Sequence, residues 1–213
     1  MRKKFTFDKN LIQNFWLQRS LTGATRWTDK RLLDFEVATI SSIANLGRPR
    51  SILDLGCGFG ELSLSLLGSD DELVAVDMEP GFATGFRSNP RANFIQSNVL
   101  EFVPDAEFDL ILLFGVVTHL DETDEDDIYK KLSKWLHRDG IAIVKHQCGV
   151  TEEIIIDSWS SELATQYQAR YPCVNSQIAS LERYFDVVEV IPYPEFANKF
   201  RDTQNFMFVC RLM

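Results

Sequence analysis

The chain has 213 residues, of which 45% are hydrophobic and 25% charged, so we expect one soluble globular domain whose core needs neither disulfides nor metal ions. Its 22 basic and 31 acidic residues give a formal charge of -9, which disfavours nucleic acid as a partner. No apolar run is long enough to span a membrane, and none near the N-terminus resembles a secretory signal, so a cytoplasmic protein is expected. Four cysteines without C-x-x-C pairing predict reduced thiols.

The first fifty residues are expected to be helical. Apolar residues recur at helical spacing in Asn10 to Arg19 and in Asp29 to Leu46, and Thr28 or Asp29 can cap the second helix. Residues 1–50 would then form an extension that either covers one edge of a sheet or acts as a lid over a substrate. The candidate substrate contacts in this extension are Trp16, Arg19, Arg26 and Trp27.

A glycine cluster follows a short apolar segment in Ser51 to Leu64. Ile52, Leu53 and Leu55 predict a buried parallel strand, and Glu61 to Leu67 predicts the start of a helix. Between them Gly56, Gly58 and Gly60 leave no side chain between the backbone and a ligand. Their G-x-G-x-G spacing differs from the dinucleotide fingerprint G-x-G-x-x-G, because position 61 holds Glu.

A second apolar segment, Glu72 to Asp77, ends in a carboxylate 23 residues after Asp54. An acidic residue at the end of the strand that follows a glycine loop can accept hydrogen bonds from both hydroxyls of a ribose. This position is consistent with either a nicotinamide or an adenosyl cofactor, so the second strand predicts a ribose-containing ligand and not its class.

The D-L-G-C-G-x-G form of residues 54–60 strongly resembles motif I of the class I S-adenosylmethionine-dependent methyltransferases. The resemblance implies that the glycine loop lies under the amino acid part of S-adenosyl-L-methionine, that Asp54 helps hold its methionine end, that Asp77 binds the ribose, and that Met78 contacts the adenine. The cofactor contacts that it implies are Asp54, Gly56, Cys57, Gly58, Gly60, Asp77, Met78, Asn98, Val99, Phe114 and Gly115.

The resemblance continues through the next two strands. Asn93 to Gln96 is a predicted strand, and Asn98 stands after it where the family commonly has an Asp that binds the adenine amino group; the amide oxygen of Asn98 can still accept that bond. Phe108 to Phe114 is apolar almost throughout, as in a central strand covered on both faces. The FGVV that follows differs from the D/N-P-P-Y/F of DNA amino-methyltransferases, so that branch is disfavoured.

The rest of the chain completes the implied architecture. That architecture is α/β and Rossmann-like: a seven-stranded, mostly parallel sheet of order 3-2-1-4-5-7-6, the last strand antiparallel, with helices on both faces, formed by residues 51–213. The elements expected in this part are helices at Asp124 to His137, Thr151 to Ala169 and Asn175 to Arg183, and strands at Ile141 to Val144, Val187 to Pro192 and Phe206 to Arg211.

Polar residues at the end of the fifth strand lie where open α/β sheets bind ligands. An alcohol acceptor needs a base, and His146 and His119 are the candidates, because His137 is explained by its place at a helix C-terminus. The residues expected to present positive charge to an anionic acceptor are Lys145, Arg170, Lys199 and Arg201. Lys145, Gln147 and Arg201 are the predicted substrate contacts in this part of the chain.

The sequence thus predicts an S-adenosylmethionine-dependent methyltransferase of a small molecule, and favours a metal-independent O-methyltransferase of a polar or anionic metabolite such as a sugar or a natural-product intermediate. Three alternatives stay open: an N-methyltransferase of a small amine, a non-catalytic adenosyl-cofactor-binding domain, and a nicotinamide-dependent oxidoreductase. Glycine spacing and the absence of a Tyr-x-x-x-Lys pair argue against the last. A monomer or homodimer without nucleic acid or membrane partners is expected.

Overall fold

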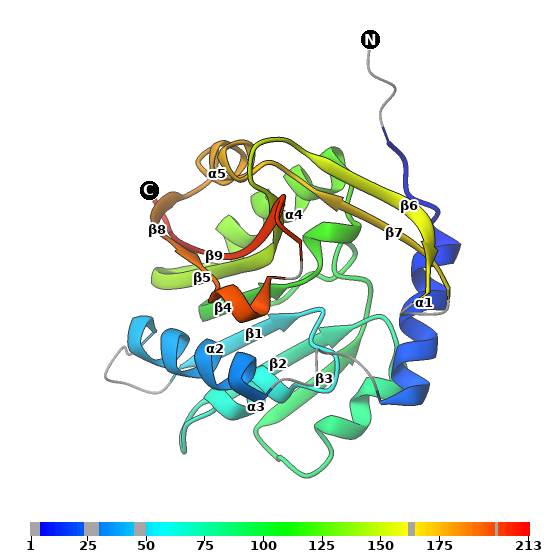
Figure 1. Cartoon of the computed structure of the whole chain (residues 1–213). Helices are drawn as coiled ribbons and strands as arrows, with labels where there is room; N and C mark the ends of the chain where they lie inside the picture. Colours follow the sequence, from blue (N-terminus) through cyan, green and yellow to red (C-terminus); the bar gives the residue numbers. More distant parts are fainter. Residues whose placement is uncertain (1–4, 24–29, 45–49, 162–164, 199) are drawn as a thin grey trace.

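The computed structural model describes residues 5–23, 30–44, 50–161, 165–198 and 200–213. It is built on a seven-stranded sheet of order β3-β2-β1-β4-β5-β9-β8 (Figure 1). The strands are β1 Ser51–Leu55, β2 Glu72–Asp77, β3 Ala92–Gln96, β4 Phe108–Phe114, β5 Leu136–Gly149, β8 Asp186–Pro192 and β9 Thr203–Arg211. β9 is antiparallel to both neighbours and the other pairs are parallel. The predicted fold class is confirmed. The predicted strand order is also confirmed when only the seven strands of this sheet are numbered, because β6 and β7 form a separate hairpin.

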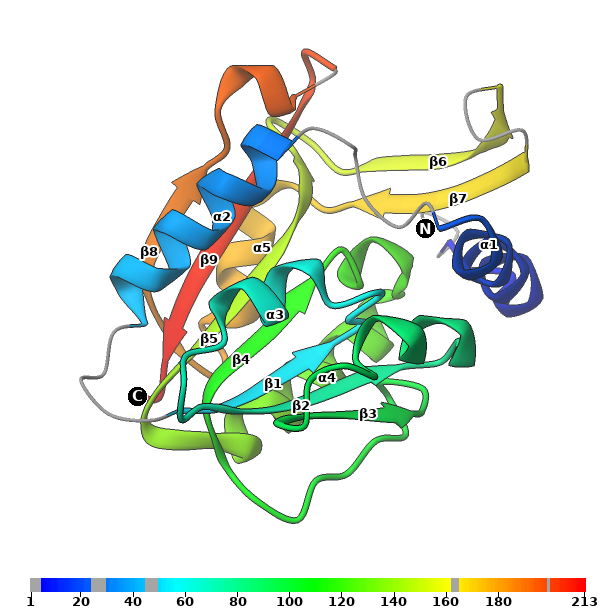
Figure 2. The ribbon, with the colours of Figure 1, turned by 90° about the horizontal axis from the view of Figure 1, so that it is seen from below.

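Helices cover both faces of this sheet. Figure 2 shows α2 and α3 in front of the strands and α4 and α5 behind them. The helices are α1 Lys9–Thr22, α2 Lys30–Ile43, α3 Glu61–Leu66, α4 Glu122–Trp135 and α5 Val174–Leu181, with 3-10 segments η1 Pro80–Gly85, η2 Val117–His119 and η3 Glu195–Ala197. Within the described ranges, no helix combines the length and apolarity that a membrane crossing requires.

The central strands divide their side chains between two hydrophobic cores. Leu53 and Leu55 of β1 pack on the α4 side, whereas Ile52 packs on the side of α2 and α3. β4 alternates in the same way, and residues 110–113 of this strand are fully buried. Because both faces are covered, these strands are apolar at consecutive positions, which is why the sequence predicted their bounds well.

The direction of winding changes between β1 and β4. β1 leads through α3, on one face, to β2, while its other neighbour β4 leads through α4, on the opposite face, to β5. The loops after β1 and β4 therefore diverge at the carboxyl edge of the sheet. Open α/β sheets bind ligands at this point, so the fold places the candidate site beside residues 56–60 and 115–119.

The segment expected to be a helix at Thr151 to Ala169 is instead an antiparallel hairpin, and this prediction was wrong. β6 Ile154–Ser160 pairs with β7 Thr165–Tyr171 outside the main sheet. Three consecutive isoleucines at 154–156 and the aromatic residues that follow favour extended backbone, because branched and aromatic side chains lose rotamer freedom in a helix. The later helix was predicted correctly, as α5.

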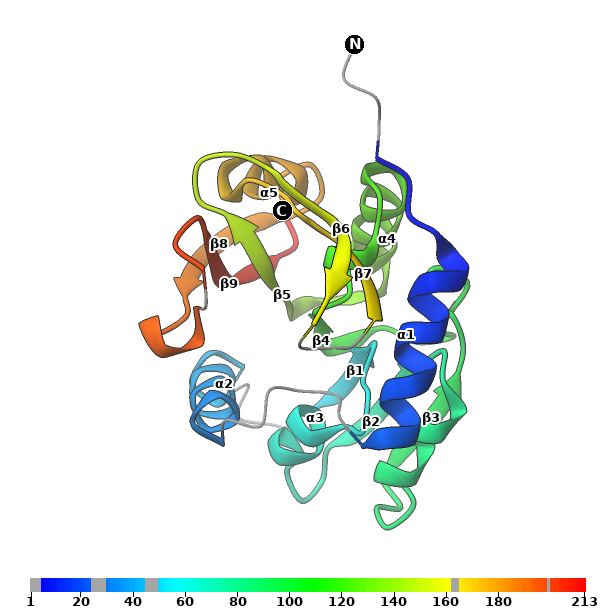
Figure 3. The same cartoon turned by 45° about the vertical axis from the view of Figure 1, so that its right-hand side comes forward.

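The two N-terminal helices lie on different parts of the molecule (Figures 1 and 3). α2 buries Leu32 and Ile40 in the core, and the buried carboxylate of Glu36 accepts a 2.7 Å hydrogen bond from the Tyr193 hydroxyl. α1 instead packs between β7 and η1: a Cβ on Gly81 of η1 would lie 3.0 Å from Ser20 Oγ. The helix bounds confirm the predicted helices, whereas the proposed caps Thr28 and Asp29 lie outside the described residues.

Arg170 attaches the hairpin to the body of the protein. Its side chain is buried and pairs with Glu125 of α4 and with Glu153, while its Nε donates to the Leu120 carbonyl oxygen at 3.2 Å. Because two carboxylates neutralise this guanidinium inside the protein, the expectation that it presents charge to an acceptor was wrong. Arg170 instead fixes β7 against the chain segment that follows η2.

Gly23 and Gly60 have the same backbone conformation but different surroundings. Substitutions at these two positions therefore distinguish the cost of backbone strain from the cost of a packing clash. Gly23 and Gly60 have φ of 73° and 76°, but a Cβ at Gly23 would meet nothing within 4 Å, whereas one at Gly60 would lie 2.4 Å from the buried ring of Phe86. We expect Gly23→Ala to lower the free energy of unfolding by about 1 kcal/mol and Gly60→Ala by about 2 to 4 kcal/mol. Urea denaturation measures both, and equal losses would contradict the packing argument.

Candidate active site

The turn after β1 lies at the switch point, where residues 56–59 are half-buried and Gly60 is buried. Gly56, Gly58 and Gly60 have φ of 73°, 53° and 76°, a region in which residues with a Cβ are strained. The amides of Gly56 and Cys57 both donate to the Val76 carbonyl oxygen of β2, at 2.8 and 3.1 Å. The turn is therefore held against the second strand by these two hydrogen bonds.

The turn also touches the loop after β4. A Cβ on Gly56 would lie 2.4 Å from Val116 Cγ2, so only glycine permits this approach. On the other loop Gly115 has φ of 74° and donates its N–H to the Lys145 carbonyl oxygen at 2.8 Å. A Cβ on Gly115 would meet nothing within 4 Å, so the space beside its backbone is open.

Asp77 links the second strand to the glycine turn. Its Oδ2 accepts a 3.0 Å hydrogen bond from the Gly58 N–H, and its Oδ1 accepts one of 3.2 Å from the Glu79 N–H. Burial raises the pKa of this carboxyl, and hydrogen bonding to the backbone amides of Gly58, Glu79 and Met78 opposes that rise. A carboxylate has about four acceptor positions, so Asp77 keeps acceptor capacity for a further donor while it holds the turn.

Two neighbours of Asp77 complete the buried part of the turn. Asp54 is buried at the end of β1, and Cys57 is half-buried in the turn itself. Burial raises the pKa of the Cys57 thiol, and the charges of Asp54 and Asp77 raise it further. The thiol therefore stays protonated at neutral pH and is no nucleophile.

The residues assigned to the adenine lie after β2 and β3. Met78, Asn98 and Val99 are all half-buried, and Gln96 Nε2 donates to the Met78 carbonyl oxygen at 3.4 Å. Asn98 Oδ1 accepts a 2.9 Å hydrogen bond from the Leu100 N–H, which orients the amide within its own turn. One lone pair of this oxygen remains for a second donor, so the geometry allows the role that the sequence predicted.

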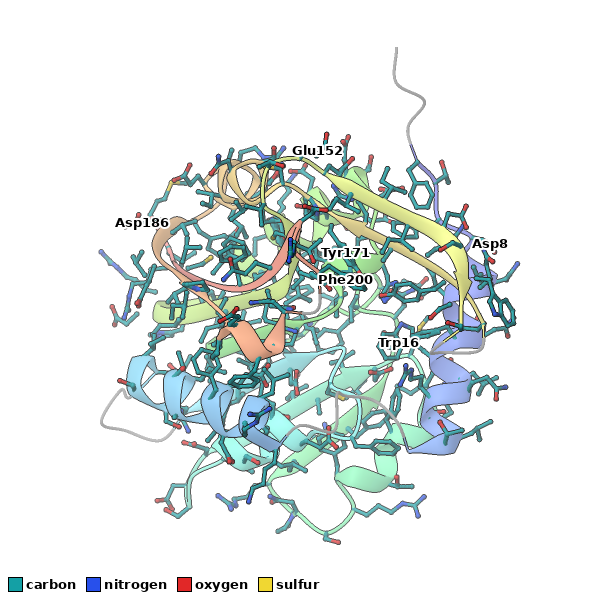
Figure 4. All side chains as sticks on the ribbon, in the orientation of Figure 1. Asp8, Trp16, Glu152, Tyr171, Asp186 and Phe200 are labelled. Atoms are coloured by element: carbon teal, nitrogen blue, oxygen red, sulfur yellow. The ribbon has the colours of Figure 1, made fainter. Side chains whose placement is uncertain are left out.

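His119 ends η2 and lies among aromatic side chains. Its Nδ1 is 3.1 Å from the Gln168 carbonyl oxygen, which can only accept, so Nδ1 carries the proton and Nε2 is the basic nitrogen. Its ring contacts Trp16, which lies on the side of α1 that faces the sheet (Figure 4), and Tyr167 of β7. Burial lowers the pKa of His119 to about 4, so the half-buried imidazole is neutral at pH 7.

His146, the other candidate base, lies inside the core. Its ring is fully buried against Phe208, with centroids 5.6 Å apart, and its Nδ1 is 3.1 Å from the Gln147 carbonyl oxygen. The buried Nε2 has no hydrogen-bond partner among the described residues. The structure therefore does not bring His146 to an open surface, and this burial argues against its exchanging a proton with an acceptor.

The predicted substrate contacts are dispersed. Lys145 places its Nζ 5.2 Å from the Tyr193 ring centroid, and Gln147 Nε2 donates to Thr203 Oγ1 at 2.5 Å. Arg201 is exposed in the turn before β9. Arg26, Trp27 and Lys199 lie outside the described residues.

Sequence reasoning missed the contribution of β7. Tyr167 and Gln168 meet His119 across 48 and 49 positions of sequence, and Phe15 of α1 closes the same cluster with its ring 5.6 Å from that of Tyr167. The branched and aromatic residues in 154–171 prefer extended backbone. Giving weight to that preference would have predicted a hairpin here in place of the helix.

Comparisons with known proteins agree with this geometry. A family model described as a methyltransferase domain matches residues 52–140, which include the glycine turn, Asp77 and His119. Over these residues the chain is therefore similar to a methyltransferase domain. The match begins at β1 and ends in β5, so it contains the two loops that diverge at the switch point.

Proteins similar to this chain carry both O- and N-methyltransferase names. The chain is 26% identical over 143 residues to the ubiquinone biosynthesis O-methyltransferase of Rickettsia bellii (strain OSU 85-389), covering 65% of the chain and 58% of that protein. It is 29% identical over 128 residues to the probable (S)-tetrahydroprotoberberine N-methyltransferase 2 of Papaver bracteatum, covering 53% of the chain and 34% of the relative. The chain thus spans little more than half of the first relative's length and about a third of the second's.

Solved structures extend the likeness in fold over the whole chain. The Burkholderia thailandensis 1,6-didemethyltoxoflavin-N1-methyltransferase, with bound 1,6-didemethyltoxoflavin and S-adenosylhomocysteine, has a TM-score of 0.79 at 18% identity and covers 100% of this chain and 93% of its own. The N-methyltransferase NodS of Bradyrhizobium japonicum WM9, in complex with S-adenosylhomocysteine, has a TM-score of 0.70 at 16% identity and covers 96% and 99%. At these identities the likeness establishes the fold.

The buried imidazole of His146 predicts a pH dependence of stability. Burial lowers its pKa to about 3, so between that value and about 6.5 the unfolded chain binds a proton that the folded chain does not. The free energy of unfolding therefore falls as the pH is lowered through this window, by about 1.4 kcal/mol per pH unit from this group. We expect His146→Phe to lose less stability than wild type between pH 6.5 and 4.5 in denaturant titrations; parallel pH profiles would contradict the assignment.

Proposed function

We propose that this chain transfers a methyl group from S-adenosyl-L-methionine to a small-molecule acceptor. The observation that carries the proposal is the link between Asp77 and the glycine turn, because one carboxylate holds the turn and keeps acceptor positions for a ribose. The fold, the family model and solved relatives with S-adenosylhomocysteine bound support the same cofactor. We also propose that it works in the cytoplasm, as a monomer or homodimer.

The residues at the switch point fit an adenosyl sulfonium. Asp77 would hold the ribose hydroxyls, the backbone of residues 56–60 would lie under the amino acid part, and Met78 and Asn98 would flank the adenine. The open space beside Gly115 provides room that a Cβ would reduce. When bound, S-adenosyl-L-methionine supplies a methyl group attached to a positively charged sulfur.

We assign His119 as the base for a hydroxyl acceptor. As a hydroxyl acceptor received the methyl group, His119 Nε2 would take the hydroxyl proton, and the demethylated cofactor would leave with the electron pair of the broken carbon–sulfur bond. The hydrogen bond from Nδ1 to the Gln168 carbonyl oxygen fixes the tautomer that makes Nε2 the acceptor. Holding the acceptor in line with the methyl group is expected to supply much of the acceleration.

Transfer to nitrogen is the second candidate. The solved relatives named above are N-methyltransferases, and a neutral amine needs no base before it attacks. His119 separates the two candidates, because an oxygen acceptor depends on its Nε2 whereas a neutral nitrogen acceptor does not.

Replacing Asp77 tests the cofactor assignment. We expect Asp77→Ala to weaken binding of S-adenosylhomocysteine at least about 100-fold, since the variant loses the ribose acceptors and releases the Gly58 amide. Isothermal titration calorimetry measures the affinity. The control is Glu72→Ala, an exposed carboxylate at the other end of β2, which should bind like wild type. Unchanged affinity in Asp77→Ala would overturn the assignment.

Replacing His119 tests the chemistry. With a hydroxyl acceptor we expect His119→Gln to lower kcat about 100-fold while the affinity for S-adenosylhomocysteine is retained. Since burial lowers the pKa of His119 to about 4, the imidazole is still unprotonated at pH 6. The wild-type rate should therefore not fall between pH 8 and pH 6. His137→Gln, beyond the end of α4, is the matched histidine control. Equal kcat in His119→Gln and wild type with that hydroxyl acceptor would contradict the assignment of His119 as the base.

A further inference from the structure

We propose that Arg170 is a positioning residue for His119. Through its hydrogen bond to Leu120, the residue after His119, it holds η2 against β7, so that the Gln168 carbonyl oxygen binds the Nδ1 proton and Nε2 remains the basic nitrogen. The inference rests on the proposed function and deepens it, because it names what fixes the orientation and the tautomer of the proposed base.

η2 is too short to fix its own direction. It has three residues, and its hydrogen bonds are local: Thr118 Oγ1 donates to the Gly115 carbonyl oxygen at 3.0 Å, and the His119 amide donates to that of Val116 at 2.9 Å. Short 3-10 segments of this kind have poor hydrogen-bond geometry and serve mainly as connectors. The orientation of His119 therefore depends on what contacts η2 from outside.

The sheet and the glycine turn fix the residues before η2. The Gly115 amide donates to the Lys145 carbonyl oxygen of β5 at 2.8 Å, and a Cβ on Gly56 would lie 2.4 Å from Val116 Cγ2. These contacts hold the start of the segment, whereas His119 lies at its other end.

β7 binds that other end at two points. His119 Nδ1 lies 3.1 Å from the Gln168 carbonyl oxygen, and Arg170 Nε donates to the Leu120 carbonyl oxygen at 3.2 Å. Two adjacent residues of the segment thus meet two residues of β7, so each hydrogen bond limits the movement that would break the other. The two nitrogens lie on different edges of the imidazole, so an Nδ1 held at β7 directs Nε2 away from the Gln168 carbonyl.

Arg170 can act as a fixed point because its own side chain is held by two carboxylates. It is 5% exposed, its Nη1 donates to Glu153 Oε2 at 2.9 Å, and its Nη2 pairs with Glu125 of α4. Glu125 also accepts a 3.1 Å hydrogen bond from Gln177 Nε2 of α5. Displacing a buried guanidinium from its paired carboxylates is costly, so the planar fork offers Leu120 a donor in a fixed place.

The same strand also holds the helix that packs on the imidazole. Gln168 Oε1 accepts a 2.9 Å hydrogen bond from the amide of Asp8, the N-cap of α1. Trp16 of that helix contacts the His119 ring edge to face, with centroids 5.6 Å apart. The polar contact and an aromatic contact of His119 therefore both depend on the position of β7 relative to η2, which Arg170 fixes.

The tautomer of His119 tests this inference without any acceptor. Nitrogen-15 NMR of the histidine-labelled chain distinguishes the Nδ1–H and Nε2–H forms of a neutral imidazole, and His119→Gln identifies the His119 signals among those of the three histidines. In the wild type at pH 7, where the ring is neutral, we expect the Nδ1–H form to predominate. Predominance of the Nε2–H form would overturn the inference, whatever the variants show.

Two substitutions in one buried network separate positioning from stability. Arg170→Lys keeps a positive charge beside Glu125 but loses the Nε donor, and we expect the ratio of Nδ1–H to Nε2–H forms to fall about fivefold, which corresponds to one hydrogen bond of about 1 kcal/mol. Glu125→Gln removes a charge from the same ion pair but keeps the bond from Arg170 to Leu120, so the wild-type ratio should remain. The surface control is Arg183→Lys, at an exposed arginine that pairs with Asp126 at 2.9 Å.

The double variant Arg170→Met with Glu125→Gln keeps the test decisive if Arg170→Lys does not fold, because it leaves no unpaired charge of this ion pair in the interior. Thermal denaturation shows which variants fold. An unchanged tautomer ratio in the folded Arg170 variants would contradict the inference. An equal fall in Glu125→Gln would also contradict it, because the effect would then follow the ion pair and not the contact with Leu120.

The affinity for S-adenosylhomocysteine, measured by calorimetry in the same preparations, separates this inference from the proposed function. We expect the folded Arg170 variants to bind this compound like wild type, because Arg170 does not belong to the proposed cofactor contacts. Absence of binding in the wild type would contradict the proposed function. Wild-type binding together with an unchanged tautomer in the Arg170 variants would contradict this inference alone.

Discussion

The hydrogen bond between the Asp77 carboxylate and the Gly58 amide is the interaction on which the site depends. It joins the end of β2 to the turn after β1, and both lie at the carboxyl edge of the sheet. The carboxylate is buried, so desolvation disfavours its charge, and the amide hydrogen bonds of Gly58 and Glu79 offset part of that cost. The same charge that stabilises the turn is then available to a ligand with hydroxyl groups.

The sheet makes this arrangement possible because its winding reverses between β1 and β4. The loops that follow these strands diverge at the switch point yet touch at Gly56 and Val116, so the cofactor turn and the segment with His119 are coupled over a short distance. α1 and the β6–β7 hairpin complete this side of the molecule, and Arg170 fixes the hairpin to α4 through a buried ion pair. This side of the molecule is thus built from segments outside the main sheet.

The parts of the fold set by local pattern were predictable from sequence. β2 and β4 have the predicted bounds, because each is a short apolar run closed by a turn residue, and the glycine turn has the positive φ values that its composition suggested. The hairpin was not predicted, since the charged and polar residues between its isoleucines and tyrosines also suit a helix. His119 was a candidate from position alone, but its tautomer depends on Gln168, a contact that no local pattern contains.

The central claim is that Asp77 and the glycine turn together bind an adenosyl group attached to sulfur. The most direct measurement is the shift of the thermal unfolding temperature with S-adenosylhomocysteine and, in parallel, with NAD, since a ligand that binds only the folded state raises that temperature. The account predicts a concentration-dependent rise with S-adenosylhomocysteine and none with NAD. A rise with NAD alone, or with neither compound, would contradict it.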